Sequence, residues 1–128
     1  MRLLLDTHIA LWAVTGDSRL SARARDLIEE PDNHSFVSVV TIWEIAIKHV
    51  LRRDEMPVAP AHALELFQTA SYAILPVEPG HAVAVADLPR HHSDPFDRML
   101  VAQAVSEPLK LLTRDKKLAA YGSIIIMA

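Results

Sequence analysis

Cysteine is absent from this sequence of 128 residues, and glycine occurs only three times. A chain without cysteine forms no disulfides and no thiolate metal sites, and it suits the reducing cytoplasm, where we expect the protein to act. Long apolar runs are also absent, since residues 124–127, among the longest, are far too few to cross a bilayer. The apolar block at residues 3–5 is too short for the core of a signal peptide. We therefore expect a soluble protein with no membrane partner.

The composition and charge balance are those of an ordinary globular protein. Hydrophobic residues make up 51% and charged residues 23%, which excludes disordered and collagen-like classes and predicts a single domain over residues 1–128. The net charge of −3 creates no overall basic field of the kind that drives nonspecific nucleic-acid binding. A nucleic-acid partner would therefore depend on a local basic patch or on bound cations.

Five apolar segments have the character of buried strands, and they alternate with helical segments. The strands are predicted at residues 2–7, 35–40, 72–77, 110–115 and 123–128. The helices are predicted at residues 8–17, 22–30, 41–54, 61–70, 81–88, 94–107 and 116–122. Strands that read as continuous apolar runs are typical of sheets covered on both faces, so the alternation predicts an α/β fold with a parallel sheet.

Four acidic residues stand where the predicted strands meet the predicted helices. Asp6 ends the first strand, Asp115 follows the fourth, and Glu44 lies in the first turns of the helix after the second strand. Asp97 joins them if its helix begins beside it. Ligands of an open parallel sheet bind outside the carboxyl ends of the strands, so we expect these acids at one edge. Carboxylates brought that close repel one another unless they share protons or hold cations such as Mg²⁺ or Mn²⁺.

Each acid also has an ordinary structural explanation. Asp94, followed by proline, is a typical helix N-cap, and Asp97 in the first turn is favoured by the helix dipole. Glu44 has a lysine four residues later, the spacing of a surface ion pair that contributes about 0.3 kcal/mol. Asp6 and Asp115 could each cap the helix that follows. All four acids meeting at one sheet edge is nevertheless hard to explain by capping and pairing alone.

Two adjacent histidines, His91 and His92, precede the helix predicted at residues 94–107. Neither has a histidine or cysteine partner at a zinc-ligand spacing, and neighbouring loop residues point apart, so we expect no metal site from them. The chain also lacks a G-x-S-x-G elbow, a P-loop and a G-x-G-x-x-G motif. A phosphatase with an aspartate nucleophile usually has a second acid two residues on, where this chain has His8.

Four segments of the chain resemble the PIN-domain family, most closely the VapC-type ribonuclease toxins of type II toxin–antitoxin systems. They are LLLDTHIALW, SVVTIWEIAIK, HHSDPFDRMLVAQA and KLLTRDKKLAAYG, which occur in the family's order and spacing between residues 3 and 122. Residues 52–90 carry little motif content. The resemblance implies a three-layer α/β/α fold with a central five-stranded parallel sheet of order 3-2-1-4-5.

The resemblance also implies a metal-dependent endoribonuclease. The family's four acids, catalytic residues and ligands of Mg²⁺ or Mn²⁺, all have counterparts in this chain. They are Asp6, Glu44, Asp97 and Asp115. Thr113 matches a supporting hydroxyl residue, and Asp94 matches a second acid that orients its helix. Arg98 would lie beside the site, either on a phosphate or in an ion pair with Asp94.

The reaction implied by the resemblance is hydrolysis of RNA phosphodiesters by water, which leaves 5′-phosphate and 3′-hydroxyl ends. A metal-free ribonuclease that uses the 2′-hydroxyl would instead leave a cyclic phosphate. Toxins of this family are held by a small VapB-like antitoxin that blocks the active site, and they usually form homodimers and larger toxin–antitoxin assemblies. The alternative is a PIN-fold module that binds RNA or protein without catalysis, and the intact acids argue against it.

Overall fold

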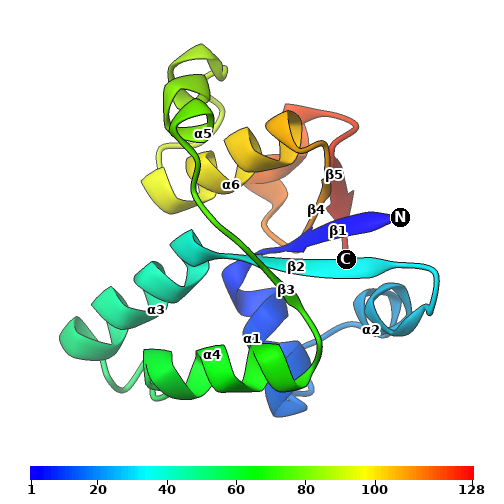
Figure 1. The fold of residues 1–128 in the computed structure, drawn as a ribbon, viewed down its shortest axis with the longest axis vertical. Coiled ribbons are helices and arrows are strands. Elements are labelled where there is room, and N and C mark those ends of the chain that lie inside the picture. The colour runs from blue at the N-terminus through cyan, green and yellow to red at the C-terminus, as the bar shows by residue number, and fades with distance from the viewer.

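The computed structural model describes residues 1–128 and contains one sheet of five parallel strands in the order β3-β2-β1-β4-β5 (Figure 1). The strands are β1 (Arg2–Leu5), β2 (His34–Ser38), β3 (Ala73–Leu75), β4 (Lys110–Thr113) and β5 (Ile125–Met127). The predicted α/β class, parallel sheet and strand order are confirmed.

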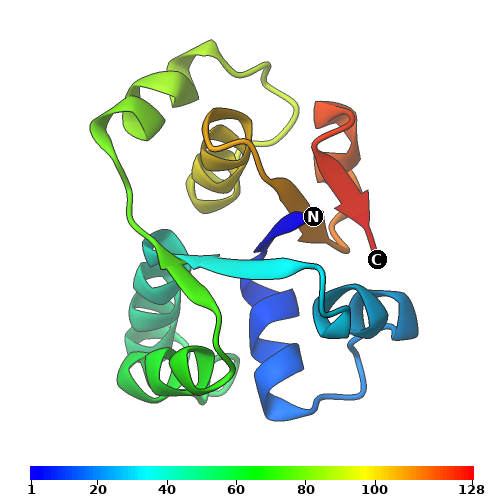
Figure 2. The same cartoon turned by 45° about the vertical axis from the view of Figure 1, so that its right-hand side comes forward.

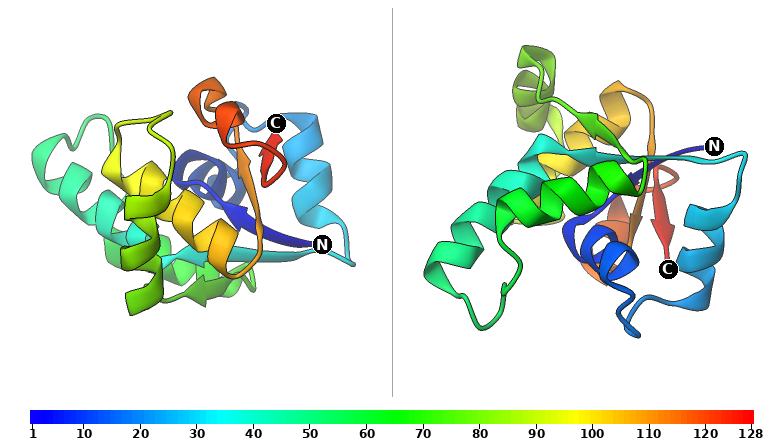
Figure 3. Two further views of the ribbon diagram at one scale, coloured as in Figure 1. Left: turned by 90° about the horizontal axis from the view of Figure 1, so that it is seen from above. Right: turned by 60° about the horizontal axis from the view of Figure 1, so that its bottom comes forward.

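The helices form two layers, one on each face of the sheet. They are α1 (Thr7–Thr15), α2 (Ala22–Glu29), α3 (Val39–Leu51), α4 (Pro60–Thr69), α5 (Pro79–Ala84) and α6 (Pro95–Ser106), with two 3₁₀ helices, η1 (Val85–Asp87) and η2 (Lys116–Tyr121). In Figure 1, α1 and α4 lie on the opposite side of the sheet from α5 and α6, and Figures 2 and 3 show the same arrangement from other sides. No helix has the length and apolar character needed to span a membrane.

Alternating side chains of the central strand explain the two layers. Leu3 and Leu5 pack into a core cluster with residues of α1, α2 and α4, whereas Leu4 packs with Leu100 of α6 and Leu118 of η2 on the other face. All three leucines of β1 are fully buried, and each contributes roughly 2 kcal/mol relative to an exposed side chain. An apolar run with no polar alternation is therefore what this central strand requires.

Several predicted boundaries differ from the structure by a few residues, all five strands are shorter than predicted, and the segment predicted as a helix at 116–122 is the 3₁₀ helix η2. The boundary between β2 and α3 matters most for the site. β-Branched residues favour strands, so the sequence predicts Val39 and Val40 in the second strand. The structure places both in α3, since the hydroxyl of Ser38 accepts a hydrogen bond from the Val40 amide at 3.0 Å and caps the helix. The earlier start brings Glu44 into the second turn of α3, on the side facing β1.

The carboxyl ends of β1 and β4 lie side by side at the centre of the sheet. Leu5 pairs with Leu112 in parallel register, and the Asp6 amide donates to the Leu112 carbonyl at 3.1 Å. This register places Asp6 next to Thr113, although the two residues are 107 positions apart in the sequence. The strand ends therefore prepare one place where distant side chains meet.

Candidate active site

A polar pocket opens at the carboxyl edge of β1 and β4, with a volume of about 270 Å³ and no hydrophobic residue in its lining. The lining residues are Asp6, Thr7, His8, Glu44, Lys48, His92, Asp94, Asp97, Asp115 and Lys117. All four acids expected at the sheet edge therefore surround one pocket, together with the capping acid of α6. Larger cavities exist elsewhere on the molecule, but none of them contains this concentration of carboxylates.

Asp6 is the most enclosed of the aspartates. One carboxylate oxygen accepts from the Ile9 amide at 2.9 Å and caps α1, while the other accepts from the Thr113 hydroxyl. Thr113 in turn accepts from the Asp115 amide at 3.0 Å, so it joins two acids of the pocket. Burial raises the pKa of Asp6, and the hydrogen bonds from Thr113 and Ile9 offset that rise only in part. Thr113 thus lies where a supporting residue was expected.

Glu44 is buried and held through both carboxylate oxygens. The Thr7 hydroxyl donates to one oxygen at 2.7 Å, and the Lys48 ammonium pairs with the other at 2.6 Å. The predicted Glu44–Lys48 pair does form, but it is not the exposed surface pair that the spacing indicated, because the glutamate is almost fully buried. A buried carboxylate with two fixed partners is a rigid component of the pocket wall.

Asp94 and Asp97 divide their roles at the start of α6. The Asp94 carboxylate accepts from the Phe96 amide at 2.8 Å and caps the helix, with proline at the first helical position. Asp97 faces the pocket. Burial, followed by repulsion from Asp94 and Asp6, raises the pKa of Asp97 to about 7. The favourable helix dipole expected for Asp97 is therefore outweighed by burial and by the neighbouring acids.

Asp115 is the N-cap of η2, and hydrogen bonds stabilise its charged carboxylate. Its carboxylate accepts from the Lys117 amide at 3.0 Å and from the His92 ring at 3.0 Å. Burial pushes the pKa of Asp115 upward, but the hydrogen bonds from His92 and Lys117 prevail, and the pKa is lowered. The lowered pKa favours the charged form of Asp115.

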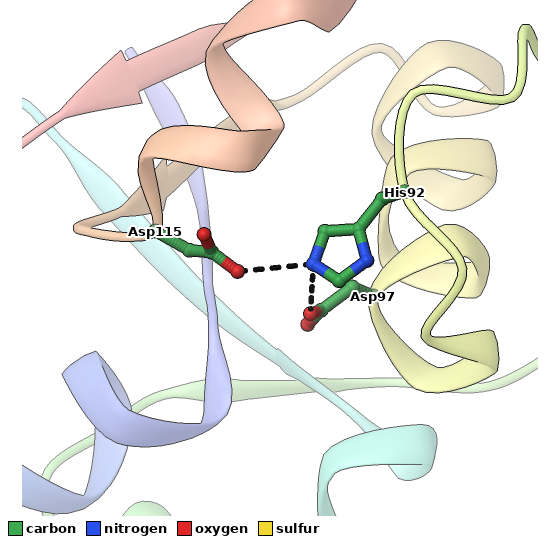
Figure 4. Close-up of side chains that lie close together, drawn as sticks. All are labelled: His92, Asp97 and Asp115. Carbon is green, nitrogen blue, oxygen red and sulfur yellow. Dashed lines mark hydrogen bonds and ion pairs between the residues drawn. The ribbon is translucent and has the colours of Figure 1, made fainter.

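His92 is the pocket residue that the sequence analysis missed. Figure 4 shows its ring between Asp97 and Asp115, with Nε2 3.2 Å from Asp97 Oδ2 and 3.0 Å from Asp115 Oδ2. His91 points away and packs against the Tyr121 ring, 5.0 Å between centroids. The two rings do point apart, as predicted, but the sequence did not indicate that His92 would contact Asp97 and Asp115. A usable signal was its place two residues before the capping Asp94, whose amide donates to His92 Nδ1 at 3.1 Å.

Arg98 lies next to Asp97 in the chain but serves the preceding loop. Its guanidinium donates to the carbonyl oxygens of Val85, Pro89 and His92 at 3.0–3.4 Å and to the Tyr121 hydroxyl at 3.3 Å. It therefore clamps the segment between α5 and α6, and the expected alternative of an ion pair with Asp94 does not form.

The donor set of this pocket suits a hard divalent cation. Five carboxylates line it, together with two lysines and two histidines. Burial raises the pKa of both Asp6 and Asp97, repulsion from Asp94 and Asp6 adds to the rise at Asp97, and a bound cation would favour the charged forms. Ligand atoms of His92, Asp97 and Asp115 lie within 4.8 Å of one another, close enough to serve one ion.

Comparison with known proteins places this arrangement in context. A family model described as "PIN domain" matches residues 3–124. The ribonuclease VapC22 of Mycobacterium tuberculosis (strain ATCC 25618 / H37Rv) is 28% identical over 121 residues, which cover 93% of this chain and 91% of that protein.

Solved structures show the same fold at low sequence identity. A chain of VapBC2 from Rickettsia felis, bound to a DNA fragment from the promoter, has a TM-score of 0.72 at 15% identity and covers 100% of this chain and 98% of its own. A toxin–antitoxin complex from Klebsiella pneumoniae has a TM-score of 0.67 at 18% identity, with 98% of this chain and 96% of the other covered. Since the family model spans nearly the whole sequence, the chain belongs to the PIN domain family.

Proposed function

We propose that this protein is a Mg²⁺- or Mn²⁺-dependent endoribonuclease and the toxin of a toxin–antitoxin pair, acting in the cytoplasm as a single PIN domain. The observation that carries the proposal is the meeting of Asp6, Glu44, Asp97 and Asp115 in one pocket of a PIN fold. A ribonuclease relative and structural neighbours from toxin–antitoxin complexes support it.

We assign a part to each acid. Asp6, Asp97 and Asp115 would hold the divalent ion, which when bound activates water and stabilises negative charge on the phosphate. Glu44 completes the negative wall and fixes Thr7 and Lys48 through its two oxygens. The other residues keep these carboxylates in position, because an acid displaced by about 1 Å loses much of its catalytic value.

Basic and aromatic side chains beside the pocket offer a path for the RNA strand. Trp12 lies under the guanidinium groups of Arg19 and Arg114, at 5.0 and 5.2 Å from the ring centre, and next to the His8 ring at 5.6 Å. Arg114 makes one hydrogen bond, to the Arg19 carbonyl, so most of its N–H groups are free for a phosphate. Such combinations of arginine and aromatic rings bind single-stranded nucleic acid. Because the net charge of −3 provides no overall attraction for nucleic acid, binding of RNA would depend on a local basic patch of this kind.

The antitoxin would lie along α3. The exposed apolar side chains of this helix are Val39, Trp43, Val50 and Leu51, and Trp43 directly precedes the pocket residue Glu44. An apolar segment of the partner on this face would carry its neighbouring basic side chains to the acidic pocket, where charge complementarity favours them. We therefore propose a small antitoxin with an apolar segment next to lysine or arginine. We also propose that the toxin forms a homodimer, which light scattering tests.

The chemistry of the cleaved ends tests the proposal. Purified protein with Mg²⁺ or Mn²⁺ should cut single-stranded RNA to 5′-phosphate and 3′-hydroxyl ends, and EDTA should stop cleavage. The Asp6→Asn variant, with an unchanged circular dichroism spectrum, is the matched control. Cyclic phosphate ends, or full activity in EDTA, would rule the mechanism out. RNA binding without cleavage in either metal would indicate the non-catalytic PIN module instead.

A further inference from the structure

The surroundings of His92 define which of its ring nitrogens carries hydrogen. The Asp94 amide donates to Nδ1 at 3.1 Å, so Nδ1 is an acceptor and Nε2 must hold the hydrogen of the neutral ring. The side chain is only 9% exposed, which leaves the ring little freedom to turn over. The loop thus presents a neutral N–H group to the pocket in a fixed direction.

That N–H group donates to one acid and lies close to a second. Nε2 donates to Asp115 Oδ2 at 3.0 Å and lies 3.2 Å from Asp97 Oδ2 (Figure 4). For Asp97 this is the one polar side chain within hydrogen-bonding distance, because its carboxylate has no other ion-pair or hydrogen-bond partner. The imidazole therefore offsets part of the repulsion between Asp97 and Asp115.

We propose that His92 is a positioning residue that holds Asp97 and Asp115 together and competes with the divalent ion for them. Because Asp97 and Asp115 would also hold the ion, the Nε2–H group would compete for their oxygens. The ring would therefore lower the affinity of the pocket for the ion while keeping the metal-free pocket assembled. The inference rests on the divalent-ion site of the proposed function.

The rival role, direct ligation of the ion by His92 Nε2, makes the opposite prediction. A ligating nitrogen needs its lone pair, so the hydrogen would have to move to Nδ1. The Asp94 amide, which caps the turn before α6, would then lose its acceptor. Ligation by His92 therefore requires this turn to open, whereas competition requires only that the ring withdraw.

Two substitutions separate the halves of the ring. His92→Asn keeps an acceptor near the position of Nδ1 and removes the donor at Nε2, whereas His92→Gln can place an amide N–H near Nε2 and loses the acceptor. Isothermal titration of metal-free protein with Mn²⁺ should show about tenfold tighter binding for His92→Asn, or about 1.4 kcal/mol. His92→Gln should stay close to the wild type. Unchanged or weaker binding by His92→Asn would overturn the proposal, and weaker binding would indicate a ligand.

A second measurement reports on the ring itself. The ¹⁵N shifts of His92 in the metal-free protein should show hydrogen on Nε2, and saturating Mg²⁺ should shift the Nε2 resonance as its acceptors leave. His91→Ala, one residue away and packed on Tyr121, should leave Mn²⁺ affinity unchanged. Absence of Mn²⁺ binding by the wild type would refute the proposed function. If the wild type binds Mn²⁺ and Asp97→Asn does not, the metal site is supported, and the results for His92→Asn then test only the role of His92.

Discussion

Two histidines of this protein make the same pair of contacts in two different settings. In the pocket, His92 accepts from the Asp94 amide and donates to Asp115, at 3.1 and 3.0 Å. Between α5 and α6, His81 Nδ1 accepts from the Glu78 amide at 3.0 Å, and Nε2 faces Glu107 Oε2 at 2.5 Å. Both rings are thus fixed in the same tautomer by a backbone amide.

The difference lies in what surrounds the carboxylate. His81 is buried, and its acceptor Glu107 is the C-cap of α6. The nearby Gln103 amide donates to the Pro76 carbonyl. This closed unit of His81 and Glu107 therefore links α5 to α6. His92 instead faces two carboxylates in an open pocket that contains further acids. A histidine that donates to a single carboxylate, as His81 does, therefore has a structural role. A histidine that faces more carboxylates than it can satisfy, as His92 does, belongs to a candidate site.

The largest contrast should appear in catalysis. Asp97→Asn removes a proposed ion ligand and should reduce RNA cleavage roughly 1,000-fold or more, about 4 kcal/mol of transition-state stabilisation. Glu107→Gln, the corresponding change in the closed unit, should leave the rate within about threefold and lower the melting temperature slightly. Rates measured with Mn²⁺ at saturating RNA check both. Near-normal cleavage by Asp97→Asn would remove the pocket from consideration as the active site.

The stability of the metal-free protein should depend on pH through Asp97, which faces His92 in the open pocket. The pKa of Asp97 is about 7 in the folded protein, against 3.8 for an unperturbed aspartate. A raised pKa contributes stability that is fully present below the unfolded value and is lost as pH rises through the folded value. At about 1.36 kcal/mol per pH unit, this difference gives an upper limit of roughly 4 kcal/mol.

Urea denaturation in EDTA at pH 5.5, 6.5 and 7.5 should therefore show falling stability with rising pH. Asp97→Asn should flatten this dependence, and saturating Mg²⁺ should recover the stability lost at pH 7.5. The lowered pKa of Asp115 contributes stability that is lost only below the carboxyl range near 3.8, so it does not disturb this window. A stability that rises with pH in the metal-free wild type would contradict the burial of a protonated Asp97.

The same substitution in both histidine units should give different results. His81→Asn keeps the acceptor for the Glu78 amide and leaves Glu107 without its donor, which should cost about 1–3 kcal/mol of folding free energy. It should not change Mn²⁺ affinity, whereas His92→Asn should. Parallel urea and calorimetric titrations compare the two directly. Equal effects of the two variants on both measurements would mean that the units do not differ.

A smaller contrast concerns the arginine beside each unit. Arg2 donates to the Glu107 carbonyl at 2.8 Å and packs on Phe36, away from the pocket. Arg114 likewise donates one hydrogen bond and packs on Trp12, but it directly precedes the pocket residue Asp115. Arg114→Ala, in an Asp97→Asn background that prevents cleavage, should weaken binding of labelled single-stranded RNA about tenfold and reduce the salt slope by about 1. Arg2→Ala should affect stability but not binding. Fluorescence anisotropy at several salt concentrations separates the two outcomes.

Much of the fold could be predicted because its signals are local or topological. Leu3 to Leu5 form a strand without polar alternation, so the parallel sheet and the edge that collects Asp6 and Asp115 followed directly. Capping was also predictable from residues alone, as with Asp94.

What could not be predicted depends on contacts between distant segments. His92 enters the pocket because the turn before α6 folds back toward Asp115, 23 residues later. Its place two residues before the capping Asp94 indicates the local contact with the Asp94 amide but not this return. Arg98 looked like a site residue by position, but its partners are carbonyls of the loop after α5, which have no side-chain signature. Strand propensity misled at Val39 because the cap that ends β2 depends on a serine hydroxyl, which the valines' branching does not reveal.

Thr113 gives the proposed toxin an order of assembly. Its hydroxyl reaches Asp6 across 107 positions, and the segment that delivers it also brings Asp115, soon after α6 has supplied Asp97. A nascent chain that has not yet placed β4 beside β1 has neither the complete acidic pocket nor the contact that holds its first member. The proposed ribonuclease would therefore stay inactive until β4 has docked beside β1.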